Sequence, residues 1–490
     1  MTSRLAGDID GTRWPARTRH RVLLVRDRYV APGEGPWLVA GVLLALGVII
    51  GFFFVVAVTD ADTWVPLITI MMLALISLPI CGWLAGRPRD SRLYKLLVIG
   101  MLLKILMAGP RYYLSEVYYD GEGDAGRYHQ AGVYFIDNLT KGEWDIAPAE
   151  LTAFPRETRV VGYVVGVLYS ALGTTFFGGF VAFSWLAWVG LMFFFRAYRI
   201  AYPNAPPYLV AKLLIFFPSL LFWPSSLGKD ALMVFLLGLF TLGASRVLSN
   251  RLLGLGIVWI ALAGYGILQI RPHLLLVGAV AMALATLTQP TGSTGYRGAA
   301  LRIAVILLVL PLLVVAVGRL DTVFGTEGES LTENLNSTVD QTAIGGSAFE
   351  ARPVRAPQDV VLATLTVLYR PFVFEADSFT VLIAALESVG LLVLTILAAR
   401  WIWRIGPTMY RWPFAGYCGA YVLAFIVAFS NVANAGILAR QRVQMFPLLM
   451  LLVAATKEFH DRTIAAEVAS QAAMHDDGPI VRPAVAPRST

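Results

Sequence analysis

The sequence predicts an all-α membrane protein that crosses the bilayer many times. Only 14% of its 490 residues are charged, whereas soluble domains carry roughly 25%. The mean hydropathy is +0.67. Long apolar runs recur from Trp37 to about Thr456, and a helix needs about 20 such residues to cross a bilayer. The net charge of +7 is then better explained by cytoplasmic loops than by a nucleic-acid partner, and we expect none.

The apolar runs predict twelve spans separated by polar segments. Their expected ranges are 37–58, 64–86, 95–110, 175–196, 208–223, 230–246, 253–270, 274–288, 301–318, 380–400, 413–430 and 442–456. Cys81 and Cys418 both fall inside apolar runs. They are therefore interpreted as small packing residues, and they offer no disulfide or zinc framework.

Basic residues gather on the side of the membrane that also holds the N-terminal tail. The segments are residues 13–28, "GRPRDSRLYK" (86–95), "RAYR" (196–199), "SRVLSNR" (245–251), "YRGAALR" (296–302) and "RWIWR" (400–404). The positive-inside rule makes this side cytoplasmic. We expect a basic cytoplasmic tail (1–36), a transmembrane domain (37–456) and a second cytoplasmic tail (457–490) without regular structure, in the cytoplasmic membrane of a bacterium.

Two long segments fall on the opposite side, at about 111–174 and 319–379. They are rich in Asp, Glu and Gly. Loops of this length in a compact fold are usually functional or disordered. Within the first, the short apolar run "VVGYVVGVLYSALG" (160–173) is predicted to be a helix lying in the outer interface, although a re-entrant segment or a span is also compatible with its length.

An acidic stretch opens the first of these loops. It is "YYDGEGDAGRYHQAG" (118–132), with Asp120, Glu122 and Asp124 at alternate positions. This spacing permits a carboxylate cluster for a divalent cation. One member could instead act as a general base, since proton abstraction needs a positioned carboxylate or histidine. The plainer alternative is a solvated acidic loop.

Lys229 and Asp230 lie at a polar turn between two spans, in "FPSLLFWPSSLGKDAL" (217–232). Asp near a helix N-terminus is favoured by the helix dipole, so a capped helix with a local ion pair is one explanation. The same dipole disfavours Lys229. A cation at this position suits an anionic ligand better than it suits the helix.

Further cations are predicted at the same outer level. Arg271 and His273 occupy a short turn, "QIRPHLLL" (269–276), Arg440 and Arg442 precede the last span, and Arg370 lies in "YRPFVFEAD" (369–377). Charged groups at membrane depth are costly and usually face a partner or a cavity. Their alternative role is to anchor helix ends by reaching the lipid head groups.

Together these carboxylates and cations predict a site for a lipid-linked phosphate. Arg offers a bidentate fork to phosphate and Lys a point charge. A nearby carboxylate could take a proton from an acceptor hydroxyl, while the cations stabilise the departing phosphate. A carboxylate base and phosphate-binding cations are the groups needed to transfer a group from a lipid phosphate. A divalent cation held by Asp120, Glu122 and Asp124 could also take part.

The order of these parts resembles the GT-C superfamily of membrane glycosyltransferases, and "FPSLLFWPSSLGKDAL" is similar to a polar turn of its protein-mannosyltransferase branch. The resemblance implies a polyprenyl-phosphate-sugar donor, a glycan or glycolipid acceptor, and an inverting transfer on the extracytoplasmic face. It implies that Asp124, or else Asp120, is the catalytic base, assisted by Asp230. Donor phosphate would be held by the cations Lys229, Arg271, His273, Arg440, Arg442 and Arg370.

Two other functions remain open on the sequence. The chain also resembles O-antigen-type polymerases, which join lipid-linked repeat units and use outer-loop arginines; Arg370, Arg440 and Arg442 fit that function as well. A transporter or flippase of lipid-linked glycans is the third candidate. Transporters commonly show internal repeats and intramembrane charges. This chain has no visible repeat, and Lys104 and Lys212 are the clearest charges inside its predicted spans.

Overall fold

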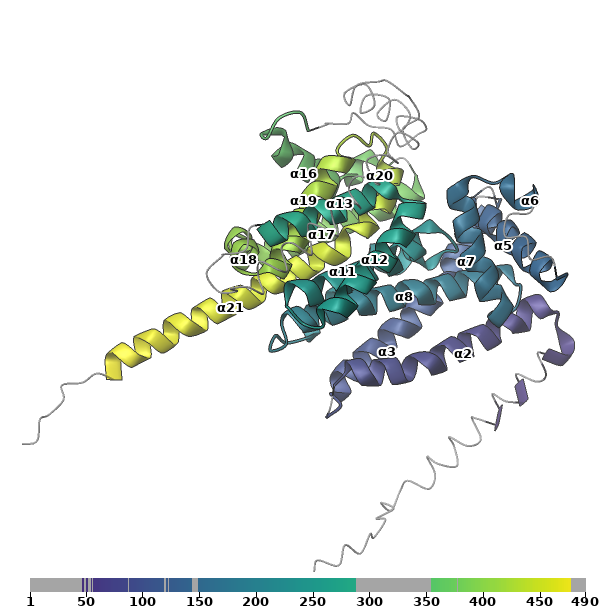
Figure 1. Ribbon diagram of the computed structural model, residues 1–490, viewed down its shortest axis with the longest axis horizontal. Coiled ribbons are helices and arrows are strands. Elements are labelled where there is room, and N and C mark those ends of the chain that lie inside the picture. The colour runs from purple at the N-terminus through teal and green to yellow at the C-terminus, as the bar shows by residue number, and fades with distance from the viewer. Residues whose placement is uncertain are drawn as a thin grey trace, which may run out of the picture. The chain divides into compact units, whose positions relative to one another are not determined.

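The computed structural model describes residues 46–47, 50–51, 54, 56–86, 88–118, 120–121, 123–142, 149–287, 354–376 and 378–476. The chain divides into two units, Met1–Asp60 and Ala61–Thr490. Every regular element in the described part of the second unit is a helix (Figure 1). The predicted all-α class is therefore confirmed.

The described part of the chain contains these helical elements, in chain order. They are α2 (Ala61–Leu84), α3 (Ser91–Leu106), α4 (Ala108–Tyr113), η1 (Leu114–Tyr118), α5 (Asp124–Thr140), α6 (Ala149–Thr152), α7 (Arg156–Leu172), α8 (Phe176–Ala201), α9 (Tyr208–Phe216), α10 (Pro218–Phe222), η2 (Trp223–Ser225), α11 (Lys229–Leu248), α12 (Leu253–Ile270), α13 (Pro272–Leu287), α16 (Asp359–Tyr369), η4 (Val373–Glu375), α17 (Phe379–Ile402), α18 (Ile405–Arg411), α19 (Pro413–Phe429), α20 (Ala435–Gln441), η5 (Arg442–Gln444) and α21 (Phe446–Asp476).

Six helical segments of the described part are long and apolar enough to cross a membrane, and eight if each of two bent pairs is one span. One pair joins α9 to α10 and η2 with a bend of 63°, and the other joins α20 and η5 to α21 with a bend of 57°. The helices α13 and α19 fill two further predicted spans but are shorter, with 16 and 17 residues. The predicted spans 301–318 and, for the most part, 37–58 lie outside the described residues.

Successive spans run in opposite directions, which produces two distinct ends of the bundle. At one end, the start of α3 meets the start of α9 through a 2.5 Å hydrogen bond from the Tyr208 hydroxyl to Asp90. The ring of Tyr202, after α8, lies 4.8 Å from that of Trp412, before α19. We call this the basic end, because it carries Arg196, Arg199, Arg246, Arg251, Arg411 and Arg462.

The other ends of the same helices also meet. Tyr112 of α4 packs against Phe176 at the start of α8, and His129 of α5 packs on the same ring, with centroids 5.8 and 4.7 Å apart. His273 near the start of α13 lies 5.8 Å from Phe429 at the end of α19. We call this the cavity end, because residues of α4 and α5 line a cavity here.

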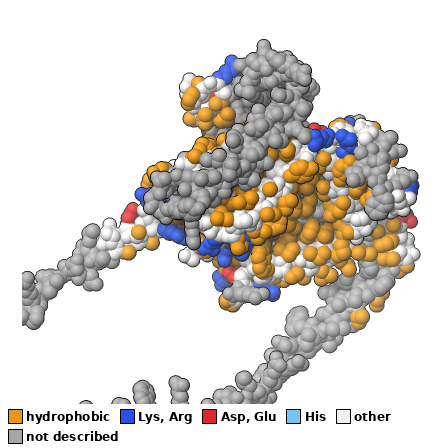
Figure 2. All heavy atoms as spheres, in the orientation of Figure 1, with side chains coloured by type: hydrophobic (Ala, Val, Ile, Leu, Met, Phe, Trp, Pro, Cys, Tyr) orange, Lys and Arg blue, Asp and Glu red, His pale blue; other side chains and the backbone are white. Residues whose placement is uncertain are grey.

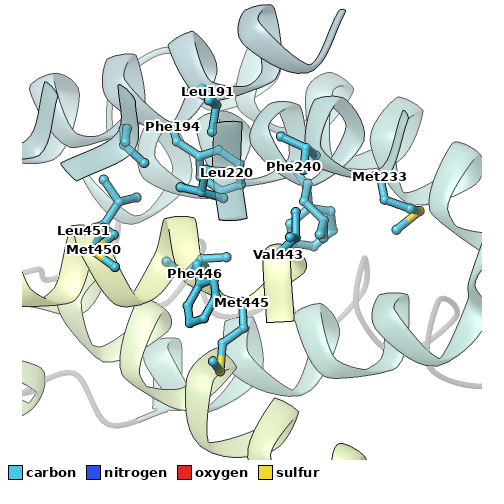
Figure 3. Packing of buried hydrophobic residues seen from close by; sticks show 14 of the residues in the cluster. Leu191, Phe194, Leu220, Met233, Phe240, Val443, Met445, Phe446, Met450 and Leu451 are labelled. Atoms are coloured by element: carbon cyan, nitrogen blue, oxygen red, sulfur yellow. The ribbon is translucent and has the colours of Figure 1, made fainter. Parts of the chain in front are cut away.

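The centre of the bundle is the crossing of α8 and α11. Gly190 and Gly238 face each other there, so closely that a Cβ on Gly238 would collide with the carbonyl oxygen of Gly190. Small residues at such crossings let helix backbones approach, which is how spans associate where lipid removes the hydrophobic driving force. Around this crossing, Figure 3 shows large apolar side chains of both helices meeting those that begin α21.

A buried lysine donates hydrogen bonds to the bent segment between α9 and α11. Lys104 of α3 is 1% exposed and donates hydrogen bonds to the carbonyls of Leu220 at 2.6 Å and Leu221 at 3.0 Å. Pro224 has no N–H to offer the Leu220 carbonyl four residues earlier, so the break leaves an acceptor that a helix would satisfy. Lys104 therefore replaces a missing backbone donor, which accounts for a charge inside a predicted span.

The outer surfaces of the spans are apolar, as in a protein that faces lipid. Large exposed hydrophobic side chains follow each other on single helices, for example Ile99, Leu102 and Leu106 on α3. Figure 2 shows one broad hydrophobic face with Lys and Arg side chains gathered at its borders. The distribution agrees with a multi-pass membrane protein, since only the borders would reach the head-group level.

The C-terminal tail differs from the sequence expectation. Residues 457–490 were expected to lack regular structure, but α21 continues to Asp476. Its extension is rich in Ala, a strong helix former, and it prolongs a helix that already exists, so no new nucleation is needed. Two i,i+4 ion pairs, Lys457–Asp461 at 2.5 Å and Glu458–Arg462 at 2.7 Å, support the first turns.

The apolar run 160–173 forms most of α7. This helix packs along α5 through small residues, with Gly162 against Ala131 and Gly132 against Val165. The helical prediction for this run is confirmed, and α7 belongs to a helical pair at the cavity end. Its depth relative to a bilayer remains a prediction.

Candidate functional site

A cavity of about 310 Å³ lies where the ends of several helices meet. This is at the small end of the roughly 300–1,000 Å³ range of ligand sites. Its lining comes from α4, η1, the start of α5, the η2 turn and α20. The lining residues are Arg111, Ser115, Gly123, Asp124, Ala125, Tyr128, Trp223, Ser226, Leu227 and Arg440.

Asp124 supplies a carboxylate to this cavity from the first turn of α5. The N-terminal end of a helix carries partial positive charge, which favours an ionised carboxylate at that position. The short π-helix η1 precedes it and places Ser115 on the same wall. Single π-turns of this kind are frequent at functional sites.

A buried carboxylate holds Arg440, a cation of the cavity lining. Asp230, in the first turn of α11, is 1% exposed and accepts hydrogen bonds from Nη2 of Arg271 at 3.0 Å and from Nε of Arg440. Arg271 also donates to Oε1 of Gln441 at 2.9 Å. Two guanidinium groups share one carboxylate, so the cluster keeps a net positive charge, and Arg440 presents it to the cavity.

Tyr128 of α5 contacts the turn that precedes α11. Its side chain is 1% exposed, and a Cβ on Gly228 would come within 3.1 Å of its ring. Burial raises the pKa of the Tyr128 phenol above its usual value, so the hydroxyl stays protonated at neutral pH. The ring of Tyr128 and that of Trp223 give the cavity two aromatic walls.

Arg111 is a second cation at the cavity. Its guanidinium lies over the rings of Phe222 and Trp223, 5.0 and 5.3 Å from their centroids. Such stacking holds a guanidinium while leaving its N–H groups at the edge. Sequence reasoning did not select Arg111, although a basic residue at the outer end of the span 95–110 runs against the positive-inside bias and could have indicated it.

Lys229 lies beside the cluster without lining the cavity. Its side chain is half-buried and interacts electrostatically with Glu157, Asp124, Arg271 and Arg440. The structure thus brings together Asp124, Lys229, Asp230, Arg271 and Arg440, from four separate parts of the sequence. These are the predicted site residues that share one place.

Two predicted cations have other neighbours. Arg442 is fully buried and donates to the Leu368 carbonyl at 2.7 Å and to Ser388 Oγ at 3.3 Å. Arg370 forms an ion pair with Glu375, with 2.6 Å between Nη2 and Oε1. Neither lines the cavity. Both secure the segment around α16 and the start of α17.

His273 and Asp120 also lie away from the lining. The His273 ring packs against Phe429, and Asp120 is exposed in a turn with φ of 49°. Glu122 falls outside the described residues. The part of the chain that the structure describes holds no group of three side chains suited to a metal ion, so the predicted cation site stays a prediction.

His129, next to Tyr128, is not among the residues that line the cavity. Its Nδ1 lies 2.6 Å from the Tyr169 hydroxyl of α7, and its ring packs on Phe176. Burial lowers the pKa of His129, so its ring is neutral at pH 7. This histidine of the acidic stretch therefore ties α5 to α7 and α8.

Ser115 and Trp223 of the lining, and Gln441 behind it, were not singled out from the sequence, and Ser226 was considered only as a helix cap. Ser and Trp next to a proline-broken span carry no pattern that distinguishes a site from a turn.

Comparison with protein families, curated proteins and solved structures finds no match, so the geometry of this cavity carries the functional argument.

Proposed function

We propose that the protein is a membrane glycosyltransferase of GT-C type, which transfers a sugar from a polyprenyl-phosphate carrier to a glycan or glycolipid acceptor. The observation that carries the proposal is the meeting of a carboxylate, Asp124, and two cations, Arg111 and Arg440, on the walls of one cavity at the ends of membrane spans. Acid and base chemistry and anion binding are thereby available within a single small volume.

The cations fit the donor phosphate. Arg440 receives its position from Asp230, and Arg111 receives its position from the rings of Phe222 and Trp223. Fixed guanidinium groups stabilise charge that develops on a departing phosphate, because they need little reorganisation during the reaction. Lys229 and Arg271 add positive potential from behind this wall.

Asp124 fits the role of general base. In the proposed step, its carboxylate takes the proton of the acceptor hydroxyl, and the acceptor oxygen attacks the anomeric carbon. The bond between that carbon and the phosphate oxygen breaks, and the polyprenyl phosphate leaves with the electron pair. A single displacement of this kind inverts the anomeric centre. The position of Asp124 in the lining favours it over Asp120.

The membrane supplies both the donor and the orientation. Because the basic residues gather at the opposite end of the bundle, the positive-inside rule puts the cavity end on the extracytoplasmic face, with the C-terminal tail in the cytoplasm. The proposed location is the cytoplasmic membrane of a bacterium, where isoprenoid carriers present their phosphates at the level of the helix ends.

The test is turnover of a labelled polyprenyl-phospho-sugar by the purified protein. Asp124→Asn should lower turnover by about 10²–10⁴, the usual contribution of a general base. Asp137→Asn is the matched control, since Asp137 is a carboxylate on the same helix outside the lining. If Asp124→Asn keeps full turnover, Asp124 is not the base.

The products separate this proposal from a polymerase. A single-sugar transferase extends the acceptor by one residue per turnover from a monophosphate-linked donor. Long ladders formed only from diphosphate-linked oligosaccharides would replace the proposal with repeat-unit polymerisation. ATP-independent movement of the intact lipid without any new glycosidic bond would indicate a flippase instead.

A further inference from the structure

A second polar cavity, of about 370 Å³, lies at the basic end. It is bordered by the end of α8, the turn between α11 and α12, the start of α19 and the C-terminal part of α21 around Arg462. The helices that bound it have their other ends near the first cavity. The two cavities therefore open at opposite ends of the bundle, and this one is not part of the site described above.

Two arginines from different elements line this second cavity. Arg251 is exposed, and its side chain makes no hydrogen bond or ion pair with the described residues. Arg462 uses Nε to bind Glu458 at 2.7 Å, and its guanidinium lies 5.5 Å from the Trp412 ring centroid. Glu458 engages only Nε, so the Nη groups of Arg462 keep donors for a ligand.

A buried hydroxyl in the same lining has no acceptor for its proton among the described residues. Tyr202 is 6% exposed; the backbone N–H of Ala415 interacts with its hydroxyl oxygen, but no acceptor in the part of the chain that the structure describes takes the O–H. Leaving a buried donor unsatisfied is costly, and native structures rarely do so without a ligand or water. The hydroxyl and two arginines offer donors and positive charge, which match the oxygens of a phosphate group.

The location points to lipid as the source of that phosphate. The cavity lies at the ends of the spans α8 and α11, and its rings Tyr202 and Trp412 are of the types enriched at membrane–water interfaces. Leu252, next to Arg251, is 70% exposed, as suits a side chain in contact with the bilayer. Basic pockets between spans on the cytoplasmic side bind anionic head groups.

We propose that this cavity binds the phosphate of an anionic phospholipid of the cytoplasmic leaflet, held by Arg251, Arg462 and the Tyr202 hydroxyl. The lipid joins α8, α11 and α21 at the end of the bundle opposite the first cavity. The proposal does not depend on the glycosyltransferase function.

The test measures lipid retention by native mass spectrometry of the full chain, taken from nanodiscs of phosphatidylcholine containing phosphatidylglycerol. The double variant Arg251→Gln/Arg462→Gln should retain phosphatidylglycerol at least about tenfold more weakly, since two charge-assisted contacts are lost. Tyr202→Phe should weaken retention by about threefold. Arg400→Gln, an exposed arginine of the same end outside the lining, should change it less than about twofold.

Folding is checked by the unfolding temperature of each variant in pure phosphatidylcholine, where the lipid site is empty in all of them. If the double variant unfolds early, Arg251→Lys/Arg462→Lys replaces it: charge is kept and the bidentate fork is lost, so retention should fall by a smaller factor. Equal retention by wild type and double variant overturns the proposal. So does equal weakening by Arg400→Gln, which indicates general surface charge, or stabilisation by inorganic phosphate without retention of phosphatidylglycerol, which indicates a soluble occupant.

Discussion

Asp230 shows how a single charge can be kept inside a membrane bundle. Its carboxylate is almost fully buried, and it is paired with two arginines from distant parts of the chain, Arg271 and Arg440. Taking a carboxylate out of water is expensive unless charged hydrogen bonds compensate it, and here two do. Asp230 therefore acts through Arg440 as a positioning residue, and it does not itself line the cavity.

We expect Asp230→Asn to destabilise the fold by about 3–5 kcal/mol, because two guanidinium groups lose the counter-charge that they share. Unfolding of the purified protein in detergent measures this. Adding Arg271→Gln to Asp230→Asn should cost less than the sum of the two single changes, by about 1 kcal/mol or more. Asp461→Asn, which removes an exposed ion pair, should cost under about 1 kcal/mol. Equal effects for Asp230→Asn and Asp461→Asn would contradict the role given to Asp230.

At the scale of elements, the crossing of α8 and α11 sets how closely the two central spans approach. The backbone of Gly190 touches that of α11, since a Cβ added to Gly190 would lie 2.6 Å from the Cα of Phe235, and Gly238 meets Gly190 in return. The start of α11 directly follows the first cavity's lining residues Ser226 and Leu227, and both helices end at the second cavity, so their separation affects both cavities.

We expect Gly238→Ala to destabilise the protein by about 1–3 kcal/mol, the usual cost of inserting a methyl group into close packing. Gly254→Ala on α12 is the control: nothing lies within 4 Å of its added Cβ, so the higher helix propensity of Ala should leave stability unchanged or raise it by up to about 1 kcal/mol. Thermal unfolding checks both, and a neutral Gly238→Ala would show that the crossing tolerates a wider separation.

The start of α3 has a pH-dependent contact. The Tyr208 hydroxyl and the backbone amides of Leu93 and Arg92 hold the pKa of Asp90 below its usual value. A depressed carboxylate pKa stabilises the fold above the unfolded value near 4 and loses that contribution as pH falls through the folded value. Asp90→Asn keeps a capping side chain but removes the charge.

We therefore expect the unfolding temperatures of wild type and Asp90→Asn to differ at pH 6 and to converge as the pH falls below about 4. Tyr208→Phe should reduce the difference at pH 6, because it removes the largest cause of the shift. A difference that is constant between pH 6 and 3 would exclude the linkage.

At the scale of the whole molecule, the spans alternate so that carboxylates and cations meet at one end and arginines collect at the other. The described part gives the cavity end Asp124, Asp230 and Glu157, and the basic end Arg196, Arg246 and Arg251. This polarity is a property of the bundle as a unit. In the orientation proposed above, the first cavity faces the side of the lipid-linked donor and the second faces the cytoplasmic leaflet.

Single cysteines test the orientation. The native Cys81 and Cys418 are buried, so they should give little background labelling. Thr140→Cys at the end of α5 and Ser470→Cys on α21 both place an exposed thiol outside the spans. We expect a membrane-impermeant thiol reagent to label Thr140→Cys in intact cells and Ser470→Cys only after permeabilisation. The reverse pattern would place the cavity in the cytoplasm.

The apolar runs of the sequence predicted the positions of most helices. Each span must satisfy its backbone hydrogen bonds within itself, so its local apolar composition is enough to recognise it. Runs such as 253–270 coincide with α12. The broken segments were harder to predict: Pro218 indicates a break within 208–223, but nothing local gives its angle of 63° or shows that Lys104 donates to carbonyls beside it. The helical extension of α21 was not predicted, because its mixed composition shows no hydrophobic periodicity.

The sequence alone determined that this is a helical membrane protein with acidic and basic groups between its spans, since hydropathy and charge are local properties of the chain. Only the tertiary structure decided which of those groups meet. The residues that lie together are Asp124, Asp230, Arg271 and Arg440. Arg370 and Arg442 contact other groups. Arg111, which the sequence did not indicate, lines the cavity. The physical reason is that such contacts join residues far apart in the chain, and their geometry depends on helix crossings and bends that no local pattern encodes.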